Sequence, residues 1–198
     1  WNSRNIRVVF EQSRIIQKKK QLFYSGRLMQ VTDTKLHGVK LIIPDRFEDH
    51  RGTYMEIYDS KNFATITDEV FVQDDISISN RGVLRGLHGD WQTTKIVTVL
   101  NGTGYAVIAD NRPSSPTYKQ WQSFTLSKLN KHMLLLPAGI GNSILALEDN
   151  MIYYYKQNTH FIDGQQFTIK WDDPEWNFWW PIKNPILSMR DERGDYVK

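Results

Sequence analysis

The chain has 198 residues, of which 40% are hydrophobic and 24% charged, and it contains no cysteine. This length suits one substantial domain, and the composition excludes wholesale disorder, a collagen helix and a coiled coil. Without cysteine there is no disulfide, thiol catalysis or thiolate metal site, which fits a reducing cytoplasm. No apolar run approaches the ~18 residues of a membrane span. We therefore expect a cytoplasmic protein that does not act at a membrane.

The net charge of +3 conceals an uneven distribution. Residues 1–30 carry seven Lys or Arg against one acid, Glu11, so that residues 31–198 sum to −3. A basic arm can bind nucleic acid, but this one lacks the alternation of cations and aromatics that single-strand binders use. The sequence predicts a basic N-terminal extension at 1–30 and one domain at 31–198, with no nucleic-acid partner.

From Val31 onward, short apolar or alternating runs recur about every ten residues, with turn residues between them. They predict strands at Val39–Ile43, Tyr54–Tyr58, Val70–Gln73, Lys95–Leu100, Gly104–Ala109, Gln120–Leu126, His132–Leu136, Ile144–Leu147 and Met151–Gln157. Only Asp59–Ile66 and Leu126–Lys131 read as helical. Regularly spaced short strands are typical of an all-β sandwich or barrel, here with a few short helices. We expect this β-domain to run to about residue 180 and the tail, Pro181–Lys198, to pack back on it. The tryptophans just before the tail, Trp171, Trp176, Trp179 and Trp180, are expected to serve this packing against the barrel or a partner.

Two segments of the β-domain are candidates for chemistry. The first, Gly82–Asp90, places His88 at the end of an apolar run, and the second, Pro137–Ser143, is a proline–glycine turn that carries Asn142. Together they have the outline of the two halves of a cupin barrel, a small jelly roll whose mouth holds the site.

The ligand positions of this outline argue against a metal ion. Metal-binding cupins are expected to place His-x-His and a Glu in the first segment and a third His in the second. Here His88 is followed by Asp90, and the second segment has Asn142. One imidazole, one carboxylate and one carboxamide make a poor divalent site. We predict a metal-free pocket, with a metal-dependent oxygenase or isomerase that uses His88 and Asp90 as the alternative.

A histidine in a barrel mouth can be a buried structural imidazole or a general base, because its ordinary pKa of ~6.5 suits proton abstraction near neutrality. The cationic residues near His88 in the sequence favour its interpretation as a general base. Arg85 lies three residues before it and Lys95 begins the next predicted strand, although Arg85 and His88 can share a face only if a bulge or the strand end turns one of them. Cations around a base suit an anionic substrate and a developing enolate.

At Val83–His88 the chain closely resembles the dTDP-4-dehydrorhamnose 3,5-epimerase family, metal-free cupins that act on nucleotide-linked 4-keto sugars. The resemblance runs from about Val39 to Asp191. Further ordered matches are Asp49–Gly52 with Glu56, Phe71–Asp75, Lys95–Val97, Asp110–Thr117, Tyr155-Lys156, Trp171–Pro174 and Leu187–Asp191.

The resemblance implies a role for each matching position. His88 is the proton-abstracting base, Asp191 the carboxylate that pairs with it, Tyr155 the acid on the opposite face, and Lys95 the cation beside the 4-keto oxygen. Substrate-binding positions fall at Arg51, Glu56, Gln73, Asp75, Arg85, Asn142, Phe161, Gln166 and Arg190, with Phe161 at the base-stacking position. The family needs no cofactor. Its members are homodimers, so that Arg51 is expected to serve the neighbour's site.

The expected function is inversion of C3, C5 or both of a nucleotide-linked 4-keto (deoxy)sugar in surface-polysaccharide biosynthesis. Gly89, Asp90 and Asn142 depart from the pattern of enzymes that act on the rhamnose precursor. They are more similar to relatives that use GDP-linked 4-keto heptoses or related capsule sugars. The nucleotide, dTDP or GDP, and the inverted centre stay open. A catalytically silent nucleotide-sugar-binding cupin is a further alternative, ahead of a nucleic-acid binder through residues 1–30.

Overall fold

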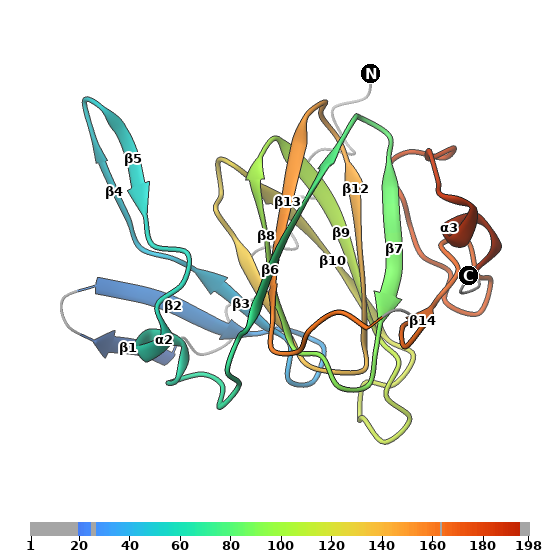
Figure 1. Ribbon diagram of the computed structural model, residues 1–198, viewed down its shortest axis with the longest axis horizontal. Helices are drawn as coiled ribbons and strands as arrows, with labels where there is room; N and C mark the ends of the chain where they lie inside the picture. The colour runs from blue at the N-terminus through green and yellow to red at the C-terminus, as the bar shows by residue number, and fades with distance from the viewer. Residues whose placement is uncertain (1–19, 25–26, 163, 195–198) are drawn as a thin grey trace.

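The computed structural model describes residues 20–24, 27–162 and 164–194, most of which lie in antiparallel strands or the turns between them (Figure 1). One sheet contains, in spatial order, β1 (Lys20–Tyr24), β2 (Arg27–Asp33), β3 (Lys40–Ile43), β11 (Met133–Leu136), β8 (Lys95–Asn101), β13 (Met151–Gln157) and β6 (Gln73–Ser79). The second contains β10 (Trp121–Ser127), β9 (Thr103–Asp110), β12 (Ile140–Ala146), β7 (Leu84–Gly89) and β14 (Phe167–Thr168). The other elements among these residues are a hairpin of β4 (Arg46–Asp49) and β5 (Gly52–Met55), α2 (Ser60–Phe63) and α3 (Met189–Arg193).

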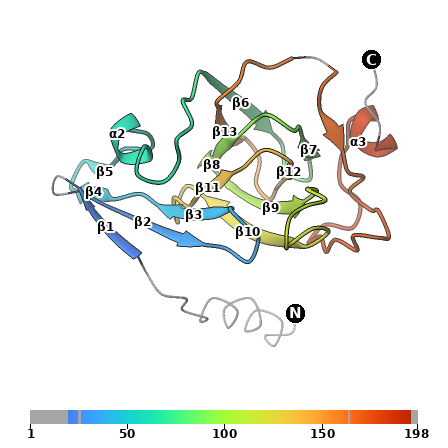
Figure 2. The same cartoon turned by 90° about the horizontal axis from the view of Figure 1, so that it is seen from below.

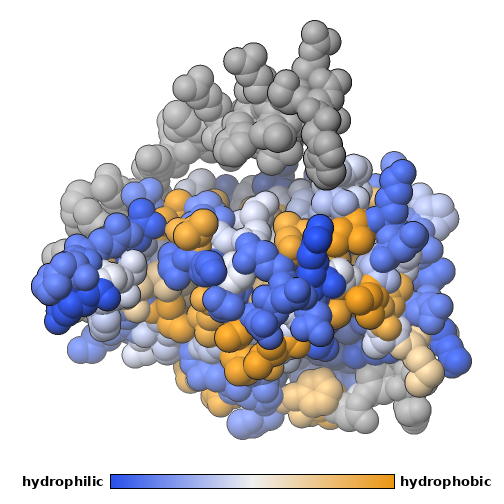
Figure 3. Space-filling model, turned by 90° about the horizontal axis from the view of Figure 1, so that it is seen from above, coloured by the Kyte–Doolittle hydropathy of each residue, from blue (hydrophilic) through white to orange (hydrophobic). Residues whose placement is uncertain are grey.

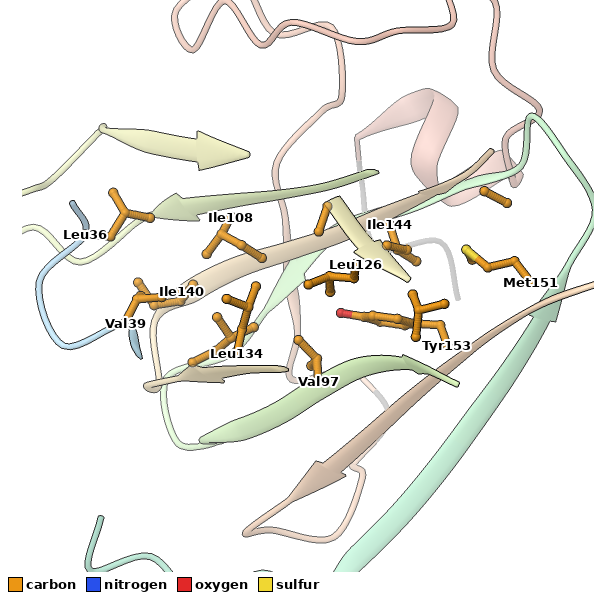
Figure 4. Packing of buried hydrophobic residues seen from close by; sticks show 14 residues of the cluster. Leu36, Val39, Val97, Ile108, Leu126, Leu134, Ile140, Ile144, Met151 and Tyr153 are labelled. Atoms are coloured by element: carbon orange, nitrogen blue, oxygen red, sulfur yellow. The ribbon is translucent and has the colours of Figure 1, made fainter. Parts of the chain in front are cut away.

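The two sheets face each other around a common interior, as Figure 2 shows. Alternation along each strand decides which side chains enter it. On β8, Val97 and Val99 point inward, and on β9 Ala106 and Ile108 do the same. With Leu134 of β11 they belong to one buried aliphatic cluster, part of which Figure 4 shows. The result is a jelly-roll barrel, which confirms the all-β fold expected from the sequence.

The outer faces of the sheets are partly covered. On the seven-stranded sheet, Ile96 and Met133 pack against Phe63 of α2. On the five-stranded sheet, Val107 packs with Trp176, which precedes the tail and whose backbone carbonyl accepts a hydrogen bond from the indole of Trp121. The described part of the tail packs back on the barrel, as the sequence predicts, because Ile186 exchanges backbone hydrogen bonds with Gly82 and Leu84. The preceding Trp176 and Trp180 belong to the cluster on this face of the barrel.

Most predicted strands are present. The strand expected at Tyr54–Tyr58 overlaps β5 only at Tyr54 and Met55, and the helix expected at Asp59–Ile66 is limited to Ser60–Phe63. Two further regions differ more from the expectation. Residues Leu126–Lys131 were expected to be helical. Instead, β10 runs to Ser127 and a turn follows, in which the side chain of Asn130 accepts hydrogen bonds from the backbone N–H groups of Ser127 and His132. A side chain that satisfies the backbone in this way competes with a helix. The helical expectation for this segment is wrong.

The second difference concerns the strand expected at Val70–Gln73. The strand β6 begins at Gln73 and continues to Ser79. Its alternation is the reverse of the usual pattern, in which apolar side chains face the interior and polar side chains face outward. Asp75 and Ser77 face the interior, whereas Ile76 and Ile78 face outward and are more than half exposed. A search for inward apolar residues therefore misses this strand.

The seven-stranded sheet begins before the predicted domain boundary at residue 31, since β1 and β2 belong to it. Residues 1–19 of the predicted basic extension lie outside the described residues. Within the described part of the chain, no helix is long and apolar enough to cross a membrane.

Candidate active site

A cavity of about 410 Å³ lies between the two sheets, on the side where β6 and β7 run. Its wall comes from both sheets and from the segments that follow β13 and β14. The lining residues are Gln73, Asp75, Ser77, Arg85, His88, Lys95, Asn142, Ser143, Ile144, Tyr153, Tyr155, Gln157, Phe161, Gln166, Ser188 and Asp191. This volume suits a small organic ligand. All four residues expected to be catalytic are among them.

His88 and Asp191 form a hydrogen-bonded pair although 103 residues separate them. The His88 Nε2 atom lies 2.6 Å from Oδ1 of Asp191, which is buried at the start of α3. Ser188 caps this helix: its hydroxyl donates to Oδ2 of Asp191 and accepts the backbone N–H of the same residue. The pair thus joins β7 to the C-terminal helix.

The environment of Asp191 defines the tautomer of His88. Burial raises the pKa of the Asp191 carboxyl, but hydrogen bonds from His88, Ser188 and the backbone of Gly86 outweigh burial and hold this pKa below its usual value. Asp191 is therefore ionised at neutral pH and can only accept hydrogen bonds. His88 consequently donates from Nε2, and Nδ1 carries the lone pair that can take a proton.

A bulge brings Arg85 and His88 to the same cavity. His88 pairs with Asn142 across β7 and β12, and Arg85 pairs with Ile144, so the two residues Gly86 and Leu87 of β7 lie opposite one residue of β12, Ser143. Gly86 occupies the bulge with a φ of +102°, and a Cβ there would lie 2.4 Å from the carbonyl oxygen of Asn142. Only glycine fits this close approach. Regular alternation would place Arg85 and His88 on opposite faces of β7, and this bulge allows both side chains to face the cavity.

Lys95 lies at the start of β8, in the sheet opposite His88, and is only 9% exposed. Burial lowers the pKa of its ammonium group; Asp90 and Asp75 oppose this change, and Arg190 adds to it. No carboxylate of the described residues lies within ion-pair distance of this ammonium group. A buried cation of this kind can stabilise negative charge on a ligand.

Tyr155 approaches the same space from β13, where its cross-strand neighbours are Asp75 and Val97. The Lys95 ammonium lies 6.0 Å from the centre of its ring. Burial raises the pKa of the Tyr155 phenol, the charge of Asp75 raises it further and that of Arg85 lowers it. The phenol therefore keeps its proton at neutral pH and can act as a donor.

Six of the nine expected substrate-binding residues line the cavity: Gln73, Asp75, Arg85, Asn142, Phe161 and Gln166. Gln73 donates to Asp75 through its amide nitrogen and accepts the backbone N–H of Phe161 through its amide oxygen. It thereby fixes the segment that carries the half-exposed ring of Phe161 at the cavity rim. Arg85 donates to the hydroxyl of Ser79 and lies between β6 and β7.

Arg190 does not line the cavity, but it forms a hydrogen bond with a residue that does. Its guanidinium donates to Thr168 and to the amide oxygen of Gln166, which does line the cavity. Arg190 therefore links α3 to β14 and to the rim.

The structure does not bring Arg51 and Glu56 to the cavity. Arg51 lies at the tip of the β4–β5 hairpin, which projects from the barrel in Figure 1, and pairs with Asp49. Glu56 follows β5 and accepts a hydrogen bond from Asn62. Any role in substrate binding would require another chain to approach this hairpin.

Several cavity residues were not expected from the sequence: Ser77, Ser143, Ile144, Tyr153, Gln157 and Ser188. Strand alternation offered a signal for some of them, because Ser77 lies two residues after Asp75, and Tyr153 and Gln157 flank Tyr155 at the same spacing. Ser188 had no such signal, since its position depends on how the tail folds back.

The arrangement does not favour the metal-binding alternative. The Asp90 carboxylate accepts the backbone N–H groups of Gln92 and Thr93 and does not line the cavity that contains His88. Asn142 accepts a hydrogen bond from Tyr153, and His88 is paired with Asp191. Among the described residues there is no group of three or more histidines or carboxylates that could hold a metal ion.

An antiparallel jelly roll with a polar cavity between its sheets is the architecture of the cupins, and an imidazole–carboxylate pair facing a lysine and a phenol is suited to proton transfer. The sequence profile described as dTDP-4-dehydrorhamnose 3,5-epimerase matches residues 33–198. The chain is 36% identical over 171 residues to the dTDP-4-dehydrorhamnose 3,5-epimerase of Shigella flexneri, an alignment that covers 84% of this chain and 94% of the relative.

Solved structures agree with this assignment. The dTDP-4-dehydrorhamnose 3,5-epimerase of Bacillus anthracis, with TDP and pyrophosphate bound, is 35% identical, with a TM-score of 0.81 over 85% of this chain and 99% of that one. The dTDP-6-deoxy-D-glucose-3,5-epimerase of Legionella pneumophila, in complex with dTDP-4-keto-L-rhamnose, is 32% identical, with a TM-score of 0.81 over 84% of this chain and 92% of that one. This chain belongs to the dTDP-4-dehydrorhamnose 3,5-epimerase family, whose members are isomerases.

Proposed function

We propose that this protein inverts C3, C5 or both of a nucleotide-linked 4-keto sugar by removing a proton next to the ketone and returning one to the opposite face. The observation that carries the proposal is the placement of His88 and Asp191 on one side of the cavity and of Lys95 and Tyr155 on the other. Such a sugar is an intermediate in surface-polysaccharide biosynthesis, and we place the enzyme in the cytoplasm.

His88 performs the first step. Its Nδ1 lone pair takes the hydrogen from the carbon next to the ketone, and the C–H electron pair moves into the carbon skeleton to form an enolate. The ring becomes an imidazolium, which the ionised Asp191 at 2.6 Å stabilises and orients. A positioned base of this kind typically accelerates a reaction 10²–10⁴-fold.

Lys95 stabilises the intermediate. The negative charge of the enolate rests on the former ketone oxygen, and the buried ammonium donates a hydrogen bond to it. Because the lysine side chain is buried and already in place, the interaction requires little reorganisation when the charge develops. One preorganised donor of this kind is worth roughly 3–4 kcal/mol.

Tyr155 completes the inversion. It lies in the sheet opposite His88, so its hydroxyl reaches the other face of the planar enolate and transfers its proton to carbon. The tyrosinate and the imidazolium then return to their starting states by exchange with solvent. Every step is a proton transfer with no net change of oxidation state, so the reaction requires no cofactor.

The rest of the cavity suits the nucleotide. Arg85 offers a guanidinium to the diphosphate, and the exposed ring of Phe161 offers a surface on which a base can stack. Gln73, Asp75, Asn142 and Gln166 supply hydrogen-bonding groups between these two ends. The bound ligands of the Bacillus and Legionella structures support a thymidine nucleotide, and GDP is the alternative to be tested beside it.

We further propose that the active protein is a homodimer in which Arg51 and Glu56 serve the site of the second copy. Two features support this. The hairpin that carries Arg51 projects from the barrel and exposes Phe47 and Tyr54, and the edge strand β6 exposes two isoleucines on its outer face. Figure 3 shows that hydrophobic side chains reach the molecular surface between hydrophilic ones. Apolar surface of this kind on an edge strand is typical of association with another chain.

The test of the proposed function is incubation in D₂O with a panel of dTDP- and GDP-linked 4-keto sugars, followed by NMR. Deuterium at C3 or C5 with inverted configuration supports the proposal and identifies both nucleotide and centre. Binding without any exchange across the panel would identify a silent sugar-binding cupin instead. Activity that EDTA removes and a divalent metal restores would overturn the mechanism. Light scattering at micromolar concentration tests the dimer.

A further inference from the structure

Tyr153 occupies an unusual position for a phenol. It belongs to the buried aliphatic cluster and is only 4% exposed, yet it also forms part of the cavity wall. Figure 4 shows its ring extending from β13 into the interior among Val97, Leu126 and Leu134. A buried hydroxyl needs a hydrogen-bond partner. Its partner here is Asn142, whose Oδ1 atom lies 2.9 Å from the Tyr153 oxygen.

This hydrogen bond has a fixed direction. Burial raises the pKa of the Tyr153 phenol, the charge of Tyr155 raises it further, and the opposing effect of the hydrogen bond with Asn142 is smaller. The phenol therefore keeps its proton. Because the Asn142 atom that faces it is the amide oxygen, which can only accept, the Tyr153 hydroxyl is the donor of this hydrogen bond. With Oδ1 turned toward Tyr153, the amino group of Asn142 is the end of the carboxamide left for the cavity, and it forms no hydrogen bond with the described residues.

Asn142 is also the residue directly opposite His88. The two pair across β12 and β7, immediately beside the bulge that directs His88 into the cavity. Cross-strand pairs on one face have their Cβ atoms roughly 5 Å apart. The carboxamide of Asn142 thus lies beside the imidazole on the same sheet, whereas Lys95 donates from the opposite sheet.

We propose that Tyr153 is a positioning residue for the epimerisation: it holds the carboxamide of Asn142 so that the amino group donates a hydrogen bond to a sugar oxygen beside the carbon that His88 deprotonates. This inference rests on the function proposed above. Asn142 stays neutral throughout the reaction and does not compete with His88 for the proton. A carboxamide free to rotate would also present its oxygen, which repels the enolate.

The first test is Tyr153→Phe, which keeps the ring and removes only the hydroxyl. We expect kcat/KM to fall roughly tenfold, as for loss of one neutral hydrogen bond. Deuterium exchange should fall by the same factor as inversion, and the affinity for the free nucleoside diphosphate should stay within about twofold of wild type. The matched control is Tyr154→Phe, because Tyr154 is the next residue of β13 and donates its hydrogen bond to Asp74 of the neighbouring strand β6, which does not line the cavity. It should retain wild-type kinetics.

The second test is a double-mutant cycle with Asn142→Ala. If Tyr153 acts through Asn142, adding Tyr153→Phe to Asn142→Ala changes kcat/KM by less than about twofold. Asn142→Asp, which keeps an acceptor for Tyr153 and removes the donor, should lose at least as much activity as Asn142→Ala.

Three results would overturn the inference while leaving the proposed function intact. These are wild-type kinetics in Tyr153→Phe, losses that multiply in the double variant, and exchange without inversion in Tyr153→Phe, which would make Tyr153 itself the proton donor. Failure of the wild-type protein to exchange any 4-keto sugar would instead overturn the proposed function.

Discussion

The barrel interior is packed on one side and hollow on the other. Where β9, β10 and β11 meet, inward residues are aliphatic, and Ile108, Leu126 and Leu134 are fully buried. Where β6 and β7 run, the inward residues are polar or charged and enclose the cavity. Ile144 and Tyr153 belong to both regions. The apolar packing on one side stabilises the barrel. The other side can therefore hold Lys95 and His88 in place around an open cavity.

This division predicts that substitutions separate into two classes. Those on the hollow side should change mainly the reaction and have smaller effects on unfolding. Those on the packed side should change the free energy of unfolding and leave the activity of each folded molecule intact.

The largest effect is expected for His88→Ala on the hollow side. Removal of the base should lower deuterium exchange next to the ketone by about 10²–10⁴-fold. The fold should survive, although some stability is lost because the buried carboxylate of Asp191 no longer receives a hydrogen bond from His88. NMR in D₂O measures the exchange and calorimetry the stability. Exchange near the wild-type rate would show that another group is the base.

Tyr155→Phe should have the next largest effect, on inversion alone. His88 can still remove the proton and return one, or a deuteron, to the same face. The variant should therefore incorporate deuterium with retained configuration, while inversion falls roughly 10²-fold or more. Wild-type inversion rates in this variant would identify a different donor and would make Tyr155 a packing residue.

The two sides of the barrel also differ in what the sequence could predict. Strands β8 to β11 follow the ordinary alternation of apolar residues, and their positions are close to those expected. Strand β6 reverses that alternation because its inward face lines the cavity, so it was placed several residues too early. Because the active-site cavity requires polar side chains on the inward face of β6, this strand lacks the inward apolar residues by which strands are usually recognised.

The site shows the same limit. The outline of a barrel mouth was visible around His88 and Asn142, and strand alternation could relate Tyr153 and Tyr155. The pairing of His88 with Asp191 could not be derived from spacing, because it depends on how α3 docks beside β7 after more than a hundred residues. Resemblance to a family supplied Asp191. The hydrogen bond between Tyr153 and Asn142 joins two strands in different sheets and needed the structure.

On the packed side, Leu134→Ala should destabilise the protein by about 3 kcal/mol, through lost burial and the cavity left behind. Leu134 is fully buried between strands β3 and β8 and does not line the active-site cavity. The midpoint of chemical denaturation should fall, and kcat at low temperature should match wild type. A large loss of kcat with unchanged stability would contradict the separation of the two sides.

The smallest effect concerns Asp110, a fully buried carboxylate at the end of β9 on the packed side. Burial alone would raise its pKa, but hydrogen bonds from Arg112, Ser115 and Thr117 lower the pKa from 3.8 to about 2. Because the folded state binds a proton less readily than the unfolded chain, Asp110 contributes about 2 kcal/mol of stability above pH 4. This contribution is lost as the pH falls from about 4 through 2.

Asp110→Asn removes the charge and cannot titrate. We expect it to be less stable than wild type by about 2 kcal/mol at pH 7, with the difference shrinking as the pH falls below 4. Urea denaturation of both proteins at a series of pH values measures this, and the activity of the folded variant should be unchanged because Asp110 does not line the active-site cavity. A stability difference that stays constant down to pH 2 would show that Asp110 acts through the shape of its loop and not through its charge.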